Sequence, residues 1–405
     1  MEYTRQAAAW MMMGLCVVMG IGTAHGELTA PETEPSSAPA PQPPGTDGKL
    51  VVHEWGTFTS VSGTDGISLE WRPLDGPTDL PSFVYTQANP GPDNRPVRGR
   101  GKGSGRIRME TPVIYFYSDR PRDISLRVDF PQGTITEWYP RAQVTPPGVN
   151  WNPFQVRPGP PPTFPTEPTH NHYYPARETD ADPIHVRGED EKFLFYRGVG
   201  DFKLPLKASL TRDAKVQLTH SQQQPLGRLM VFEKRGDKIG FEVLADPARP
   251  NATLPRPALN DDLGDVLDRL YTMLIAEGLY PKEASSMIET WRDHWFEDGL
   301  RVFYMLPQDL TDTILPLHMT PAPTELVRVL VGRIELLTPE QLDDVHARLL
   351  KAHYSAPQRR ADLIGALNKD YGRFLEPIIG RIMVRLTTND PLKNASWMPW
   401  TLSKE

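Results

Sequence analysis

Two histidines one residue apart, His170 and His172, are the first side chains whose types and spacing could bind a metal ion. Alternate residues of an extended segment point to the same side, so both imidazoles could reach one ion. Further ligands follow within 13 residues of His172, and these are Glu178, Asp180, Asp182 and His185. The pattern predicts a site for zinc or another divalent cation with His170, His172 and His185 as ligands. The alternative is a solvated polar loop.

Carboxylates beside tryptophans form a second candidate group. Glu precedes Trp at Glu54-Trp55, Glu70-Trp71 and Glu137-Trp138. Aromatic rings beside carboxylates are typical of sugar-binding surfaces, and two carboxylates at a suitable separation could act as acid and base on a glycosidic bond. We take Glu54, Glu137 and Glu289 as candidate catalytic residues; Glu289 shares one side of a predicted helix with Asp293. The alternative is that the tryptophans pack in the core and the acids are solvated.

The segment His53-Glu54-Trp55-Gly56 opens a predicted strand. Side chains alternate between the two faces of a strand, so His53 and Trp55 are expected on one face and Glu54 on the other. Only a bulge, for which Gly56 is suited, would bring all three together. His53, Trp55 and Trp138 are candidate ligand-binding residues, against the alternative that they are buried for packing.

Basic residues and glycines alternate from Arg95 to Arg108 and predict an exposed positive arm. Within it, Arg98, Arg100 and Lys102 are candidate contacts for an anionic envelope polymer or lipid headgroups. The alternative is a solvated loop without a partner. The arm does not join a predicted strand to a helix, which excludes a dinucleotide-binding turn.

Common enzyme signatures are absent from the sequence, namely the His-Glu-x-x-His metalloprotease motif, the Gly-x-Ser-x-Gly elbow, the P-loop and a cysteine-based zinc pattern. The motifs therefore leave open whether the protein is an enzyme.

The first 26 residues have the pattern of a secretory signal peptide. Arg5 precedes an apolar run from Ala7 to Ala24, and Ala24-His25-Gly26 suits cleavage before Glu27. An uncleaved membrane anchor is the alternative. The only cysteine, Cys16, lies inside this run, so the mature chain can form no internal disulfide. We expect a periplasmic or secreted protein. The net charge of -7 argues against a nucleic-acid partner.

The chain is expected to divide after residue 48, because residues 27–48 form a proline-rich linker. Short apolar runs between turn residues predict a β-rich domain over residues 49–255, with a proline-rich insertion at 146–168 that interrupts regular structure. Asn260 is expected to cap a first helix. Helical stripes after Asn260 and Pro281, the capping box Thr338-Pro339-Glu340-Gln341 and strands at Leu300–Leu306 and Leu326–Leu337 predict a second domain over 256–405. The fold class expected is α+β: an N-terminal antiparallel β-sandwich-like domain followed by a helix-rich α+β domain.

Several segments resemble a group of exported bacterial proteins without a characterised activity. They are His53-Glu54-Trp55-Gly56-Thr57-Phe58-Thr59, Met109-Glu110-Thr111-Pro112-Val113-Ile114-Tyr115-Phe116-Tyr117, Glu137-Trp138-Tyr139-Pro140, Trp291-Arg292-Asp293-His294-Trp295-Phe296 and Val331-Gly332-Arg333-Ile334-Glu335-Leu336-Leu337. The resemblance implies a shared fold and transfers no catalytic residue.

Two functional hypotheses follow from these patterns. The first is an exported envelope binding or scaffold protein that contacts a cell-envelope polymer or carbohydrate. The second is a periplasmic or secreted hydrolase, either metal-assisted or carboxylate-based. Convergence of His170 and His172 with a third ligand, or of two carboxylates across a cleft, would favour the second. The oligomeric state stays open.

Overall fold

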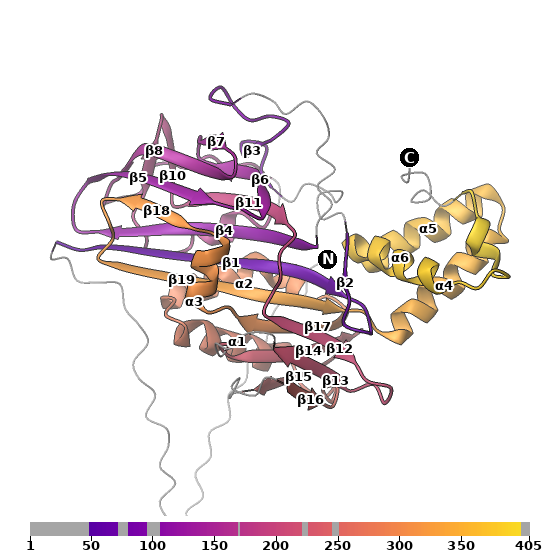
Figure 1. Cartoon of the computed structure of the whole chain (residues 1–405). Coiled ribbons are helices and arrows are strands. Elements are labelled where there is room, and N and C mark those ends of the chain that lie inside the picture. Colours follow the sequence, from indigo (N-terminus) through magenta and orange to yellow (C-terminus); the bar gives the residue numbers. More distant parts are fainter. Residues whose placement is uncertain are drawn as a thin grey trace, which may run out of the picture. The chain divides into compact units, whose positions relative to one another are not determined.

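The computed structural model describes residues 48–71, 80–94, 106–168, 171–220, 226–244 and 251–397. The predicted signal peptide at 1–26 and almost all of the linker at 27–48 lie outside these ranges. The described part is α+β and dominated by strands (Figure 1). Within the described ranges, no helix is both long and apolar enough to cross a membrane.

A ten-stranded sheet forms the centre of the fold. Its order is β15-β14-β17-β19-β1-β4-β11-β6-β3, with β2 paired to β1 (Figure 1). All neighbours run antiparallel except β1 and β19, which are parallel over twelve residue pairs. The strands are β1 (Leu50–Ser62), β2 (Ser68–Leu69), β3 (Tyr85–Thr86), β4 (Ile107–Ser118), β6 (Gly133–Tyr139), β11 (Leu194–Gly200), β14 (Leu229–Arg235), β15 (Lys238–Leu244), β17 (Gly299–Met305) and β19 (Glu325–Leu336).

Two smaller sheets share a hydrophobic core with one face of the central sheet. Val52 and Phe116 of the central sheet belong to the same core as Leu126 and Trp151 of the second sheet and Leu218 of the third. The second sheet contains β5 (Arg122–Asp129), β7 (Gln143–Thr145), β8 (Gly148–Val156), β9 (Ile184–Val186), β10 (Glu189–Glu191) and β18 (Leu317–Thr320). The third contains β12 (Leu206–Leu210), β13 (Val216–His220) and β16 (Asn251–Leu254).

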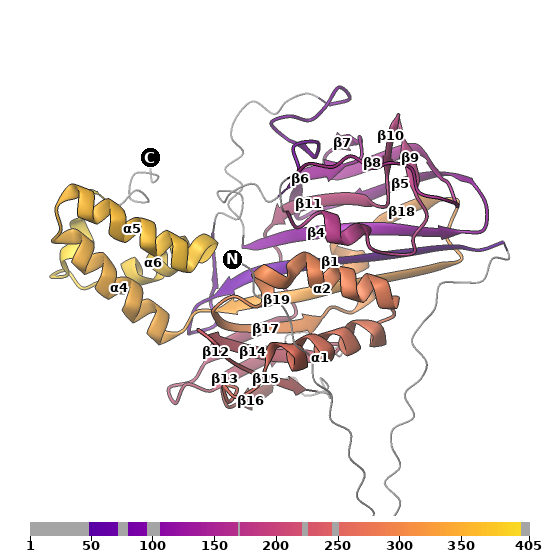
Figure 2. The same ribbon diagram turned by 180° about the vertical axis from the view of Figure 1, so that it is seen from behind.

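Helices α1 (Leu263–Ala276) and α2 (Pro281–Trp295) cover the opposite face of the central sheet (Figure 2). Helix α2 begins at Pro281, a residue type that favours the first helical position, and Glu283 forms a capping box with Tyr280. Apolar side chains of both helices then pack on strand residues such as Val51 and Trp55. The remaining helices are α3 (Gln308–Ile314), α4 (Pro339–His353), α5 (Pro357–Tyr371) and α6 (Leu375–Arg385), with short 3-10 turns η1 (Tyr174–Arg177), η2 (Gly372–Phe374) and η3 (Pro391–Asn394).

Helices α4 to α6 form a third core near the ends of β1 and β19. Leu342, Val345 and Ile378 pack there with Val61 of β1 and with Leu337, which follows β19. The predicted capping box is present, since the Thr338 side chain accepts a hydrogen bond from the Gln341 backbone amide and Gln341 bonds back to Thr338. The prediction of a helix starting at Pro339 is therefore confirmed.

Alternation along β1 places side chains as predicted. Val52 belongs to the core between the sheets, whereas Val51 and Trp55 belong to the core beneath the helices. The register between β1 and β4 shifts between Trp55 and Thr57, which is the bulge that Gly56 made conceivable. A Cβ at Gly56 would lie 2.9 Å from Leu330, so the close approach of neighbouring strands also requires glycine.

Three expectations differ from the structure. Strands before and after residue 255 share the central sheet, so that boundary does not separate two sheets; β14 pairs with β17, and β1 pairs with β19. Residues 148–156 of the proline-rich insertion form β8, because Pro153 lies where the register between β5 and β8 shifts and needs no ladder donor. Asp262, rather than Asn260, caps α1.

Candidate functional site

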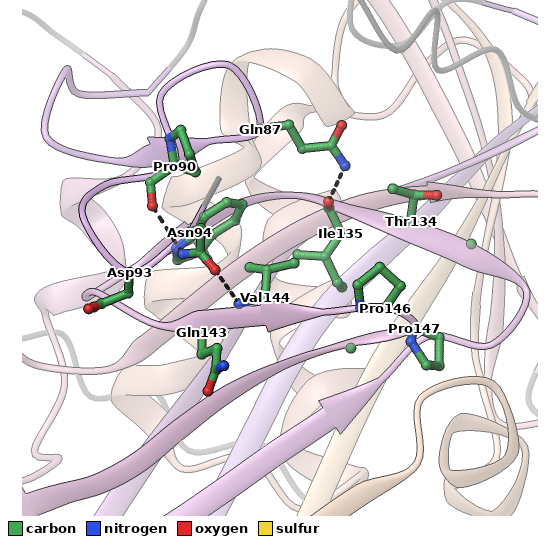
Figure 3. A pocket seen from close by; sticks show the side chains of 13 residues that line it. Gln87, Pro90, Asp93, Asn94, Thr134, Ile135, Gln143, Val144, Pro146 and Pro147 are labelled. Atoms are coloured by element: carbon green, nitrogen blue, oxygen red, sulfur yellow. Dashed lines mark hydrogen bonds between the residues drawn. The ribbon is translucent and has the colours of Figure 1, made fainter. Parts of the chain in front are cut away.

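A pocket of about 390 Å³ opens between β6, the turn from β7 to β8 and the loop after β3 (Figure 3). Its volume lies in the range of small-molecule sites. The residues lining it are Gln87, Pro90, Asp93, Asn94, Gly133, Thr134, Ile135, Trp138, Gln143, Val144, Pro146, Pro147 and Gly148. The pocket thus combines proline rings, aliphatic side chains and a buried tryptophan with a few polar groups.

Hydrogen bonds from Asn94 hold the pocket's loop in place. Its Nδ2 donates to the Pro90 carbonyl at 3.1 Å, and its Oδ1 accepts from the Val144 amide at 2.7 Å (Figure 3). Its Nδ2 also donates to the Ala142 carbonyl at 2.7 Å. Gln87 Nε2 donates to the Ile135 carbonyl at 2.7 Å. Because both the nitrogen and the oxygen of the Asn94 side-chain amide already make hydrogen bonds within the protein, Asn94 shapes the pocket rather than contacting a ligand.

Asp93 is the one ionisable residue among the described residues that line the pocket. Its carboxylate is 2.5 Å from Arg141 Nε and 2.8 Å from Arg187 Nη1. The hydrogen bond from Arg141, with further help from Arg187, lowers the pKa of Asp93 below its usual range. An ionised carboxylate held by two arginines is poorly suited to act as an acid or a base.

The pocket's remaining polar groups are uncharged. Thr134 and Gln143 are exposed at its rim. Trp138 is buried, and its indole Nε1 has no hydrogen-bond partner in the described part of the chain. A buried N–H without an acceptor is costly, so an oxygen acceptor that came within reach of this nitrogen would be stabilised. Trp138 is therefore the predicted ligand-binding residue that the structure places at a pocket.

The three candidate catalytic carboxylates do not converge. Glu54 is fully buried, 2.5 Å from Arg328 Nε, and it accepts a hydrogen bond from Tyr196. Glu137 lies on β6, where Thr136 donates to it, and Glu289 pairs with Arg292 at the exposed surface of α2. Strands β4 and β11 separate β1 from β6, which at about 4.8 Å per step puts Glu54 and Glu137 roughly 14 Å apart. Glycosidase carboxylates lie within about 9.5 Å of each other.

His53 and Trp55 are buried beneath the helices rather than in a pocket. His53 Nδ1 lies 2.8 Å from Glu283 Oε2, and both side chains are inaccessible to solvent. Tyr117 also donates to Glu283, at 2.7 Å. Trp55 is fully buried in the core beneath α1 and α2. His53 and Trp55 are therefore buried for packing, which was the alternative to a ligand-binding role.

The predicted metal ligands are not brought together within the described residues. His170 lies outside them. His172 Nδ1 bonds to the Thr290 carbonyl at 2.9 Å, and its ring lies 4.3 Å from that of His294. His185 lies on β9, 2.7 Å from Asp190. The described ranges contain no group of three or more His, Cys, Asp or Glu side chains that could hold a metal ion.

Arg98, Arg100 and Lys102 also lie outside the described residues, so their role as contacts for an anionic polymer stays a prediction. At the described end of this segment, Arg106 pairs with Asp201 at 3.4 Å and Arg108 lies 3.6 Å from Glu110.

The sequence patterns missed the residues that shape the pocket. Gln87, Asn94 and Gln143 are isolated amides, and no spacing rule distinguishes them from other polar loop residues. Glu283 was detectable as the third residue of a capping box, but its buried bond to His53 was not. The pairing of Arg328 with Glu54 joins residues 274 positions apart.

Comparisons with known proteins do not show a family for this chain. No protein-family model matches the sequence, and no curated protein matches it significantly. One solved structure that matches is the Mu homology domain of Fcho1 from Danio rerio with a bound Eps15 peptide. The match has 8% sequence identity, covers 72% of this chain and 94% of that chain, and has a TM-score of 0.25. At that TM-score the likeness carries no argument.

Proposed function

We propose that this protein is an exported binding protein of the cell envelope, and that its ligand occupies the pocket of Figure 3. The observation that carries the proposal is the chemistry of the lining. Apolar walls surround a few uncharged hydrogen-bonding groups, and Asp93, the ionisable residue among the described lining residues, is held by two arginines. These described residues can bind and orient a ligand, but none of them offers a free acid or base.

The ligand class that fits this lining is an uncharged carbohydrate. The Gln87 and Gln143 amides, the Thr134 hydroxyl and the Trp138 indole can bond to hydroxyl groups without a charged partner. The apolar C–H faces of a sugar ring match the rings of Pro90 and Pro146. Among the described lining residues, none offers a charged ligand a free counter-ion to offset its lost hydration.

Export is part of the proposal and rests on the signal-peptide pattern of residues 1–26 and on the absence of cysteine from the rest of the chain. We also propose that the central sheet and the second sheet, which share a hydrophobic core, correspond to the expected β-sandwich.

Calorimetric titration with uncharged oligosaccharides of glucose, galactose, mannose and N-acetylglucosamine tests the proposal. We expect at least one of them to bind with a 1:1 stoichiometry. Trp138→Phe keeps a ring but removes the indole N–H, and Gln143→Ala removes the rim amide; each should weaken binding by about three- to tenfold, as expected for one hydrogen bond. Gln217→Ala, at an exposed position of β13, is the matched control and should bind like the wild type.

Failure of all these sugars to bind at millimolar concentration would overturn the carbohydrate assignment. Binding of a synthetic peptide with the proline-rich sequence of residues 31–44, sensitive to the same variants, would instead assign the pocket to a peptide. Sugar binding that ignores both pocket variants would place the site elsewhere.

A further inference from the structure

A second site with different chemistry lies where β4, β19, α2 and η2 meet. We call it the Arg373 cluster, and it consists of Trp71, Glu110, His294, Arg333 and Arg373. Arg373 Nη1 donates to Glu110 Oε1, and the guanidinium lies 5.0 Å from the centroid of the Phe374 ring and 5.9 Å from that of Trp71. The Arg333 guanidinium lies 5.3 Å from the same Phe374 ring. The cluster does not involve the pocket of Figure 3.

One complete edge of the Arg373 guanidinium has no hydrogen-bond partner among the described residues. Its Nε and Nη2 atoms are buried and make no hydrogen bond to the described part of the chain. These two N–H groups point in parallel, and together they match two oxygens of a carboxylate, phosphate or sulfate. The Arg373 side chain as a whole is 14% exposed, so solvent reaches other atoms of this side chain although the two edge atoms are buried.

The other buried atoms of the cluster that have no hydrogen-bond partner among the described residues are also donors or, for the histidine ring, can be donors in one tautomer. They are Trp71 Nε1, His294 Nδ1, and the Nε and Nη1 atoms of Arg333. Donors cannot satisfy one another, and a water molecule would bring two further protons that need acceptors. An oxyanion brings acceptors only.

The local charge also favours an anion. Among the described residues, ion pairs join Arg108 and Arg373 to Glu110, Arg301 and Arg333 to Glu335, and Arg333 to Glu297, so these ion pairs together contain one more positive than negative charge. Burial raises the pKa of Glu110, but Arg373, Arg108 and Arg333 outweigh it and hold the value at about 2. Glu110 is therefore ionised at neutral pH and contributes one negative charge to this count.

We propose that the Arg373 cluster is a binding site for an oxyanion, which the Nε–Nη2 edge of Arg373 holds with two parallel hydrogen bonds. Trp71 and His294 supply further donors beside it. The site takes a phosphoryl, sulfuryl or carboxylate group, and it is independent of the proposed carbohydrate pocket.

Titration of the full mature protein with inorganic phosphate, sulfate and acetate, at constant ionic strength set with chloride, tests this proposal. We expect a saturable rise in melting temperature, with a phosphorus NMR or calorimetric titration giving the affinity. Preference for phosphate and sulfate over acetate would assign a tetrahedral group, and the reverse a carboxylate. Arg373→Lys keeps the charge but loses the two-donor edge, and should weaken binding about tenfold or more. Arg360→Lys, on α5 against Trp397, is the control and should not change it.

A second variant keeps the test decisive if Arg373→Lys folds poorly. Glu110→Gln removes the carboxylate beside the site, so the variant should bind phosphate more tightly, by about threefold or more, and phosphate should restore its melting temperature. A purely structural cluster would show lower stability in both variants and no response to anions. The absence of saturable binding to the wild type, or equal affinity in wild type and Arg373→Lys, would overturn the proposal.

Discussion

His53 on β1 and Glu283 on α2 are 230 residues apart in sequence, yet their side chains meet at 2.8 Å with no exposure to solvent. Glu283 also accepts hydrogen bonds from the Tyr117 hydroxyl and the Tyr280 backbone amide. One carboxylate thus satisfies three donors from a strand, its neighbour and the start of a helix. It joins α2 to the central sheet.

Glu283→Ala should therefore destabilise the protein strongly. His53, Tyr117 and the Tyr280 amide would lose their shared acceptor in a buried position, which costs about 3–5 kcal/mol. Urea denaturation of the mature protein measures this loss. Glu289→Ala, six residues later on the exposed surface of the same helix, should change stability by less than about 0.5 kcal/mol. Similar losses in the two variants would contradict the role assigned to Glu283.

Two glycine substitutions should have opposite effects. A Cβ on Gly332 of β19 would lie 2.1 Å from the buried Tyr304 ring, so Gly332→Ala should destabilise by about 1–3 kcal/mol or prevent folding. Gly365 lies inside α5, where an added Cβ meets nothing within 4 Å. Gly365→Ala should stabilise by about 0.5–1 kcal/mol, because alanine favours the helix. Thermal unfolding of both variants checks the signs.

The protein should lose stability in mild acid through His294. Burial, with the nearby charges of Arg373 and His172, lowers the pKa of His294 from 6.5 to about 4. Above pH 6.5 the imidazole is neutral in both the folded and the unfolded protein, so its protonation costs no stability. Below pH 6.5 the unfolded protein binds the proton first, so the free energy of unfolding falls until about pH 4. The loss should reach about 2 kcal/mol at pH 5 relative to pH 8.

His294→Asn should remove most of that difference, and the comparison separates His294 from carboxylates that titrate in the same range. His318→Gln, at an exposed position of β18, is the control and should keep the wild-type pH profile. An unchanged profile in His294→Asn would show that other groups carry the acid sensitivity.

The exported product should begin near Glu27. The apolar run and the small residues before this position predict cleavage there. Intact-mass measurement of protein recovered from outside the cytoplasm tests the prediction. A mass that includes residues 1–26, for protein found in the membrane fraction, would indicate an uncleaved membrane anchor instead of a cleaved signal peptide.

Local patterns in the sequence were enough to place most of the regular elements. The alternation of side chains predicted which residues of β1 share a face, and the Thr338 capping box predicted the start of α4. These features depend on residues only a few positions apart, because side-chain periodicity, caps and tight turns are local properties. Trp138 could be proposed as a ligand contact for the same reason, as an aromatic residue on a predicted strand.

Tertiary structure alone decided which elements meet. Period-two alternation predicts which side chains of β1 share a face, but not that β19 pairs with β1 in parallel, from Val51 opposite Glu325 onwards. It therefore could not predict that the strands before and after residue 255 share one sheet, that Glu54 meets Arg328, or that Arg373 reaches Glu110. Register between distant strands is set by complementary packing across the whole core, and that information is not contained in any single segment. The candidate carboxylates and histidines had suitable types and spacing, but the tertiary structure did not bring them together. Glu54 and His53 are buried against the distant partners Arg328 and Glu283, whereas Glu137, Glu289 and His185 pair with residues close to them in sequence on separate elements.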